Sequence, residues 1–111
     1  MPYICGMDIF FAIGEPTRRA IVELLAKNGR LSATDISGRF RMSMPAISQH
    51  LKVLREASVV SVEKEGQKRM YTLNTHALHE LETWSANMET LWSARFKKIE
   101  NLLKNQKPNR K

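Results

Sequence analysis

Across residues 44–73 the spacing of the apolar residues changes from that of a helix to that of strands. Ile47, Leu51 and Leu54 recur at intervals of four and three, which places them on one face of a helix. Beyond this helix, apolar and polar residues alternate on both sides of the stretch 65–68, the pattern of a β-hairpin with a flexible basic tip. A helix joined so closely to a hairpin restricts the fold more than any other feature of the chain.

Two helices are predicted before this segment. Pro16 stands at a favoured first helical position and opens a helix over residues 15–29, which stops at Asn28-Gly29. Ser32 and Asp35 form a variant of the capping box and predict a helix over residues 31–40. Side chains expected to be buried in these helices are Ile21, Leu24, Leu25, Ile36 and Phe40.

The two ends of the chain carry further apolar segments. Residues 7–14 are apolar nearly all round, which fits a terminal strand, a wholly buried helix, or a helix packed on its own core and on a second subunit. From about residue 75 to 104, spacings of three and four persist and predict one long helix, with or without a kink. We therefore expect a mainly α fold with a β-hairpin (α+β), a winged helix-turn-helix. It forms a single domain over residues 1–104, and residues 105–111 form a disordered basic tail.

The outward face of the helix after Ser43 indicates what the domain binds. Its side chains are small, amide-bearing or basic, and no acid occurs before Glu56. In helix-turn-helix proteins the second helix lies in the DNA major groove, where such side chains read base edges and basic ones contact phosphates. Taken singly these residues are ordinary solvated side chains, and only their combination with a basic wing points to double-stranded DNA. The candidate DNA contacts are Ser43, Met44, Ala46, Ser48, Gln49, His50, Lys52, Arg55, Gln67, Lys68 and Arg69.

The distribution of charge supports a polyanionic partner. The formal net charge is +7 and the pI is about 9.9. Residues 39–69 hold seven basic and three acidic side chains, and residues 95–111 hold seven basic and one acidic. Cys5 is the single cysteine, which excludes an intrachain disulfide and a Cys-rich zinc site and suits a reducing cytosol. No apolar run is long enough for a membrane span, so we expect a soluble, cytoplasmic protein.

Three segments resemble the ArsR/SmtB family of bacterial winged-helix transcriptional regulators: "GEPTRRAIVELLA", "ISQHLKVLREASVV" and "EGQKRMYTLN". The resemblance spans roughly residues 8–75. It implies a homodimeric repressor of an inverted-repeat operator, released by an inducer and dimerising through its first and last helices. The interface residues that this implies are Ile9, Phe10, Phe11, Trp84, Met88, Trp92, Phe96 and Ile99.

The sequence departs from the family pattern at two positions near helix ends. Glu15 stands where aspartate is usual as a helix cap, which is a weaker choice. Ser58 replaces the glycine that normally follows the recognition helix. If this position requires a positive φ, serine costs on the order of 1 kcal/mol relative to glycine.

The metal-sensing ligands of the family are missing. Ser32 and Thr34 stand where some members place thiolates, and hydroxyls are poor ligands for soft metals. On the last helix only His76 matches a second ligand set, because Asn74, Asn87 and Thr90 occupy its other positions. We therefore expect no metal and no cofactor. Whether Cys5, or His76 with His79 and Glu82, binds a metal stays open beside the plainer interpretation of a solvated first helical turn.

Other classes of function fit the sequence less well. The chain has no Gly-rich phosphate loop and no plausible Ser/His/Asp set, so an enzyme is not expected. RNA binding would favour exposed aromatic side chains, and the wing offers only Tyr71. The alternatives are a winged-helix protein–protein interaction module and a metal-responsive repressor with a non-standard site. Trp84 and Trp92 suggest either packing between subunits or a pocket for an apolar small-molecule inducer.

Overall fold

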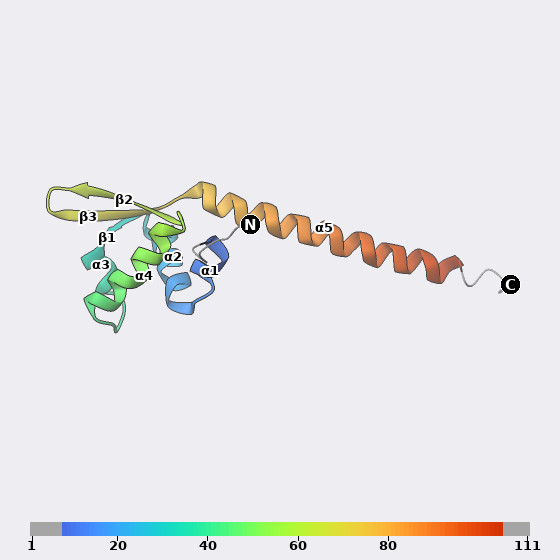
Figure 1. Ribbon diagram of the computed structural model, residues 1–111, viewed down its shortest axis with the longest axis horizontal. Coiled ribbons are helices and arrows are strands. Elements are labelled where there is room, and N and C mark those ends of the chain that lie inside the picture. Colours follow the sequence, from blue (N-terminus) through green and yellow to red (C-terminus); the bar gives the residue numbers. More distant parts are fainter. Residues whose placement is uncertain (1–7, 106–111) are drawn as a thin grey trace. The chain divides into compact units, whose positions relative to one another are not determined.

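The computed structural model describes residues 8–105 as five helices and three strands (Figure 1). The chain divides within its last helix into two units, one up to His79 and one from Glu80, and each is described separately. In chain order the elements are α1 (Ile9–Ile13), α2 (Pro16–Asn28), β1 (Arg30–Ser32), α3 (Ala33–Ser37), α4 (Met44–Glu56), β2 (Val60–Glu65), β3 (Lys68–Leu73) and α5 (Thr75–Asn105).

The starts of α2, α3 and α4 are fixed by side-chain caps at the predicted positions. The Glu15 carboxylate accepts from the Arg18 backbone N–H at 2.8 Å, so the weaker cap is still a working one. Ser32 and Asp35 form a complete capping box, with each side chain accepting from the other's backbone N–H. The Ser43 hydroxyl accepts from the Ala46 N–H at 3.3 Å. These contacts confirm all three predicted helix starts.

The segment between α3 and α4 differs from the prediction. α3 ends at Ser37, three residues before the expected end, because Gly38 caps it. Phe40 therefore lies in the turn rather than on a helix, and it is half-buried instead of buried. Leu24 is half-buried as well.

The sheet has three antiparallel strands in the order β1-β3-β2. β2 and β3 form the predicted hairpin, with Glu65 opposite Lys68 and Gly66-Gln67 as the loop. The φ of Gly66 is 64° and that of Gln67 is not positive, as in a type II′ turn with glycine first. Strand β1 was not predicted; it pairs Leu31 with Tyr71.

Helix α4 packs its apolar face into the centre of the first unit. It contacts α1, α2, α3 and β2, and Ile47, Leu51 and Leu54 are buried as predicted. A helix-turn-helix followed by a two-stranded wing is a winged helix-turn-helix, which confirms the predicted fold. The largest fully buried side chains are Ile21, Leu25, Ile36, Ile47, Leu51, Leu54 and Val59.

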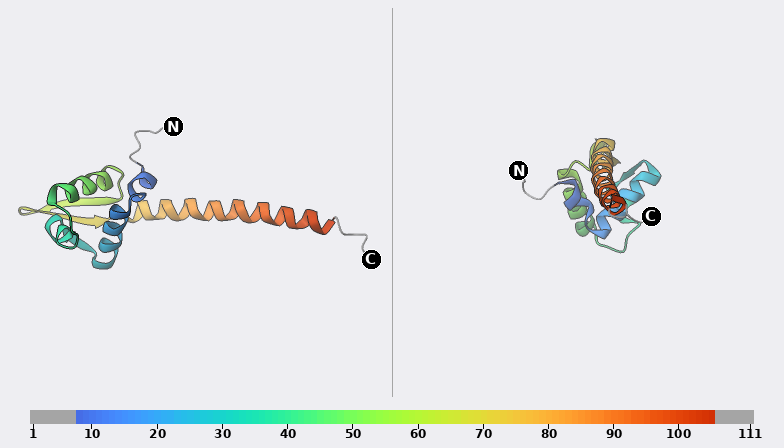
Figure 2. Two further views of the ribbon diagram at one scale, coloured as in Figure 1. Left: turned by 90° about the horizontal axis from the view of Figure 1, so that it is seen from below. Right: turned by 90° about the vertical axis from the view of Figure 1, so that its right-hand side faces the viewer.

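The two terminal segments are both helices. α1 buries Ile9 and Ala12 but leaves Phe10 and Phe11 exposed, so it is neither a strand nor a wholly buried helix. α5 is one helix of 31 residues (Figure 2). Among residues 8–105, no helix is both long and apolar enough to cross a membrane. The exposed apolar side chains of α5 are Leu78, Trp84, Met88, Leu91, Trp92, Phe96, Ile99, Leu102 and Leu103.

Candidate nucleic-acid interface

Helix α4, the beginning of α3 and the wing line one groove of about 690 Å³. The groove therefore joins segments more than thirty residues apart in the sequence. Eight of the predicted DNA contacts line it: Met44, Ser48, Gln49, Lys52, Arg55, Gln67, Lys68 and Arg69. It is also lined by Ser32, Ala33, Thr34, Pro45 and Tyr71, which the sequence did not single out for this role.

A second hollow, of about 320 Å³, lies against α4 and is lined by Arg18, Gln49, His50, Lys52, Val53 and Glu56. Gln49 and Lys52 line both hollows and are exposed. They therefore stand on a crest of α4 between the two hollows. A crest of this kind, with an amide and an ammonium group, has the chemistry needed to meet base edges and phosphates.

Three of the predicted DNA contacts do not line the groove. The Ser43 hydroxyl is occupied as the cap of α4. Ala46 is half-buried. His50 is half-buried too, and its ring faces α2 rather than the wing. Its position on the helix, one residue past Gln49 and one before the buried Leu51, could have indicated this, because 100° per residue turns it toward the core.

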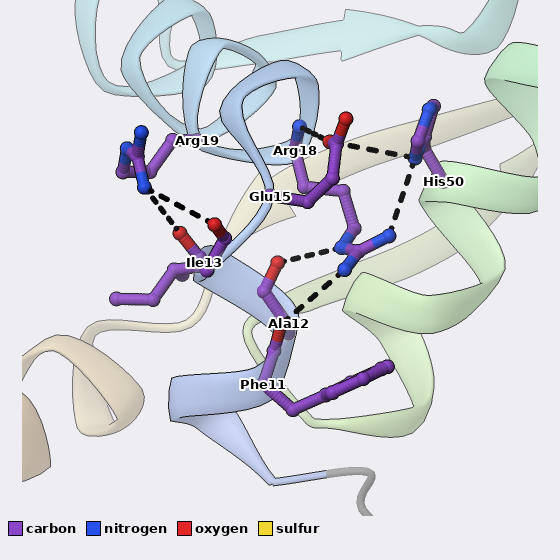
Figure 3. Close-up of polar contacts among 8 residues, drawn as sticks. Phe11, Ala12, Ile13, Glu15, Arg18, Arg19 and His50 are labelled. Carbon is purple, nitrogen blue, oxygen red and sulfur yellow. Dashed lines mark hydrogen bonds and ion pairs between the residues drawn. The ribbon is translucent and has the colours of Figure 1, made fainter.

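His50 belongs to a cluster of polar contacts among α1, α2 and α4 (Figure 3). Its Nδ1 lies 3.4 Å from Arg18 Nη1 and 3.9 Å from Glu15 Oε1. Arg18 also donates from Nε to the Ala12 carbonyl at 2.6 Å and from Nη2 to the Phe11 carbonyl at 3.3 Å. The cluster ties α4 to α1 and α2.

The charge lining the groove is positive. Lys52, Arg55, Lys68 and Arg69 line it without an acidic side chain. Arg30 on β1 pairs through Nη2 with two acids of β2, Glu65 at 3.0 Å and Glu63 at 3.4 Å. The hydrogen bond to Glu65 and the charges of both acids raise the pKa of Arg30. These pairs offset the two acids nearest the wing tip.

Two capping carboxylates are held in their charged form. The hydrogen bond from the Arg18 backbone N–H lowers the pKa of Glu15, against the opposing effect of burial. The backbone N–H and the hydroxyl of Ser32 lower the pKa of Asp35 in the same way. Both helices thus begin with an ionised cap, which also favours the helix dipole.

The described residues offer no metal centre. Over residues 8–105, no three side chains among histidine, cysteine, aspartate and glutamate are grouped closely enough to hold a metal ion. This includes His76, His79 and Glu82. Cys5 lies outside the described residues.

Comparisons with known proteins agree with this geometry. Residues 15–62 match the family described as bacterial regulatory protein, arsR family. The transcriptional repressor SdpR of Bacillus subtilis (strain 168) is 44% identical over 80 residues, covering 72% of this chain and 88% of that protein. The arsenical resistance operon repressor of Escherichia coli (strain K12) is 28% identical over 106 residues, covering 95% of this chain and 87% of that protein.

A solved structure supports the same assignment. An ArsR family transcriptional regulator matches with a TM-score of 0.71 and 27% identity, covering 77% of this chain and 87% of that one. These relatives are regulators of transcription. The chain belongs to the ArsR family, and it is a winged helix-turn-helix transcriptional regulator rather than an enzyme.

Proposed function

We propose that the protein is a homodimeric repressor that binds an inverted-repeat operator in the cytoplasm, its own promoter included. The observation that carries the proposal is the basic groove shared by α4 and the wing. Two relatives are named as repressors, SdpR and the arsenical resistance operon repressor, which supports repression over activation. Binding at the promoter blocks RNA polymerase.

In this proposal α4 enters the major groove with its N-terminal half against base edges. Ser48 and Gln49 read donors and acceptors, with Ser43, Met44 and Ala46 forming the leading end of the helix. Lys52 and Arg55 contact phosphates, which sets the position of the protein without selecting sequence. Gln67, Lys68 and Arg69 bring the wing tip to the backbone or to the adjacent minor groove.

Two copies are proposed to pair through α1 and α5. The support is the exposed apolar side chains on each helix, which are Phe10 and Phe11 on α1 and Trp84, Met88, Trp92, Phe96 and Ile99 on α5. Ile9 is buried in the core of the first unit and is not among them. A monomeric soluble protein rarely leaves so many large apolar side chains in water. A two-fold axis would present the recognition helices to successive major grooves, about 34 Å apart.

An apolar inducer fits the same region. Trp92, Ser93, Phe96, Lys97 and Glu100 line a hollow of about 330 Å³ on α5. An apolar ligand seated there in the dimer would change the pairing of the two helices and release DNA. Release by candidate lipophilic compounds should be lost in Trp92→Ala, and release that is indifferent to this substitution would refute the hypothesis.

The experiment that tests the proposed function is a titration of the protein onto DNA from upstream of its own gene, against a scrambled duplex, at several salt concentrations. We expect a preference for the native fragment that persists at high salt. Equal binding to both duplexes that falls steeply with salt would leave only a basic surface, since that contribution is independent of sequence. No binding would favour the protein–protein interaction module.

A further inference from the structure

Arg18 projects from α2 and contacts the end of α1. Its Nε and Nη2 donate to the carbonyls of Ala12 and Phe11, and its guanidinium lies over the Phe11 ring at 5.3 Å from the centroid. The last carbonyls of a helix lack partners within the helix, and the bond from Nε satisfies that of Ala12, while the Phe11 carbonyl also accepts from the Gly14 N–H at 3.2 Å. Arg18 thus fixes a helix of only five residues against α2.

The remaining nitrogen of the same guanidinium faces the recognition helix. Arg18 Nη1 lies 3.4 Å from His50 Nδ1, and the His50 side chain is only 18% exposed (Figure 3). A guanidinium only donates hydrogen bonds, so His50 Nδ1 is the acceptor in this contact. The three nitrogens of one side chain therefore link α1 and α2 to α4.

This link differs in kind from the rest of the packing of α4. Ile47, Leu51 and Leu54 bury α4 through apolar contacts, which are not directional and tolerate small rotations of a helix about its axis. A hydrogen bond is directional. His50 is next to Gln49, so any rotation that breaks the contact with Arg18 also displaces the crest that faces DNA.

We propose that Arg18 and His50 are positioning residues that set the orientation of the recognition helix relative to α1 and α2. The inference rests on the proposed function, because it takes α4 as the element that reads DNA. It assigns sequence selectivity to a contact outside the groove. Nonspecific affinity should not depend on it, because the cations that meet phosphate are elsewhere.

The test compares the affinities for two duplexes, one that the wild-type protein enriches from a random-sequence pool and its scrambled counterpart. At about pH 8 we expect Arg18→Lys and His50→Phe each to lower the ratio of the two affinities roughly five- to tenfold, the size expected for one lost hydrogen bond of ordinary strength. Affinity for the scrambled duplex should stay unchanged. His50→Gln keeps an acceptor and should restore most of the ratio.

Arg19→Lys is the matched control. Arg19 also caps α1, donating to the Ile13 carbonyl at 3.1 Å and the Gly14 carbonyl at 3.5 Å, but His50 is not among its contacts. A general loosening of α1 would affect both arginine variants alike, whereas the proposal predicts that Arg19→Lys keeps its selectivity. Urea unfolding of each variant separates lost selectivity from lost stability.

Restoration by His50→Gln distinguishes positioning from a purely structural role, because this variant returns a hydrogen-bond acceptor without the imidazole ring. Unchanged ratios in both variants, or equal effects of Arg18→Lys and Arg19→Lys, would overturn the proposal. So would additive losses in the Arg18→Lys/His50→Phe double variant, because two partners in one contact cannot be lost twice. A wild type that shows no preference between the duplexes would instead refute the proposed function.

Discussion

Ser58 follows α4 with a φ of 61°, in the left-handed region that crowds a Cβ atom. The fold holds it there, since its N–H donates to the Arg55 carbonyl and its carbonyl accepts from Asn74 Nδ2 at 2.8 Å. We expect Ser58→Gly to raise the free energy of unfolding by roughly 0.5–1 kcal/mol, because relief of strain exceeds the added entropy of the unfolded chain. Urea unfolding followed by circular dichroism measures this.

Ser61→Gly is the control for this substitution. Ser61 is exposed within β2 and has no positive φ, so glycine there removes only strand preference and should lower stability. Loss of stability in both variants would contradict the strain argument. The affinity for DNA should change in neither.

Asp35 gives stability a dependence on pH. Its folded-state pKa lies below the ordinary value, so near pH 4 the unfolded chain binds more protons than the folded one. The stability that the carboxylate contributes is therefore complete above its ordinary pKa and is lost as the pH falls through the lower folded value. We expect Asp35→Asn to be less stable than the wild type at pH 7 and to approach it at about pH 3. Unfolding curves at both pH values check this. A difference in stability between Asp35→Asn and the wild type that is the same at both pH values would show that the charge of Asp35 does not cause it.

Helix α4 and the wing are expected to divide the recognition of DNA between them. Gln49→Ala should relax the preference for the native duplex, because an amide that pairs with a base edge is lost. Lys68→Ala should weaken all duplexes about equally and lower the slope of log affinity against log salt by roughly one. Titrations of both variants on native and scrambled duplexes measure the two effects. Loss of affinity for one sequence only, in both variants, would show that the division is wrong.

The wing also depends on β1, whose Arg30 reaches Glu63 and Glu65 on β2. All three side chains are well exposed, so the pairs should contribute little to stability. Their effect on DNA is larger, since Arg30→Ala would leave two carboxylates near the wing tip uncompensated. We expect severalfold weaker binding at low salt and recovery when Glu63→Gln and Glu65→Gln are added. Titration of the variants onto DNA measures this recovery. If the affinity does not recover, the result would indicate that Arg30 contacts DNA directly.

The elements that the sequence predicted well are those with local signals. Ser32 with Asp35 and Ser43 set helix starts within a few residues of chain, and Gly66 fixes the hairpin loop by its own φ. Strand β1 carries no such signal, because three residues cannot show alternation and its partner Tyr71 lies forty residues away. The sequence did not predict that the His50 ring faces α2, and the reason is related. Its contacts come from α2, and only the packing of three helices brings them together.

As a whole, the chain presents a DNA-facing unit and a helix whose apolar surface calls for a partner. On α5, Glu80, Glu82 and Glu89 occupy the first half, and the second half is mostly basic. Two copies of α5 running antiparallel would set these opposite charges against each other while burying the apolar side chains between them. The charge pattern and the apolar face thus support the same proposed two-fold pairing.

The proposed dimer predicts how the affinity for DNA depends on the number of half-sites in the duplex. Phe96 is 60% exposed, and Phe96→Glu would place a charge in the proposed interface. We expect this variant to sediment as a monomer and to lose at least about tenfold in affinity for a duplex with two half-sites, because the second half-site is no longer bound at high effective concentration. Its affinity for one half-site should match that of the wild type.

Thr90→Glu, on the opposite face of α5, is the control and should remain dimeric. A Phe96→Glu variant that stays dimeric would place the subunit contact elsewhere, and a monomer that binds both duplexes as tightly as the wild type would separate dimerisation from operator recognition.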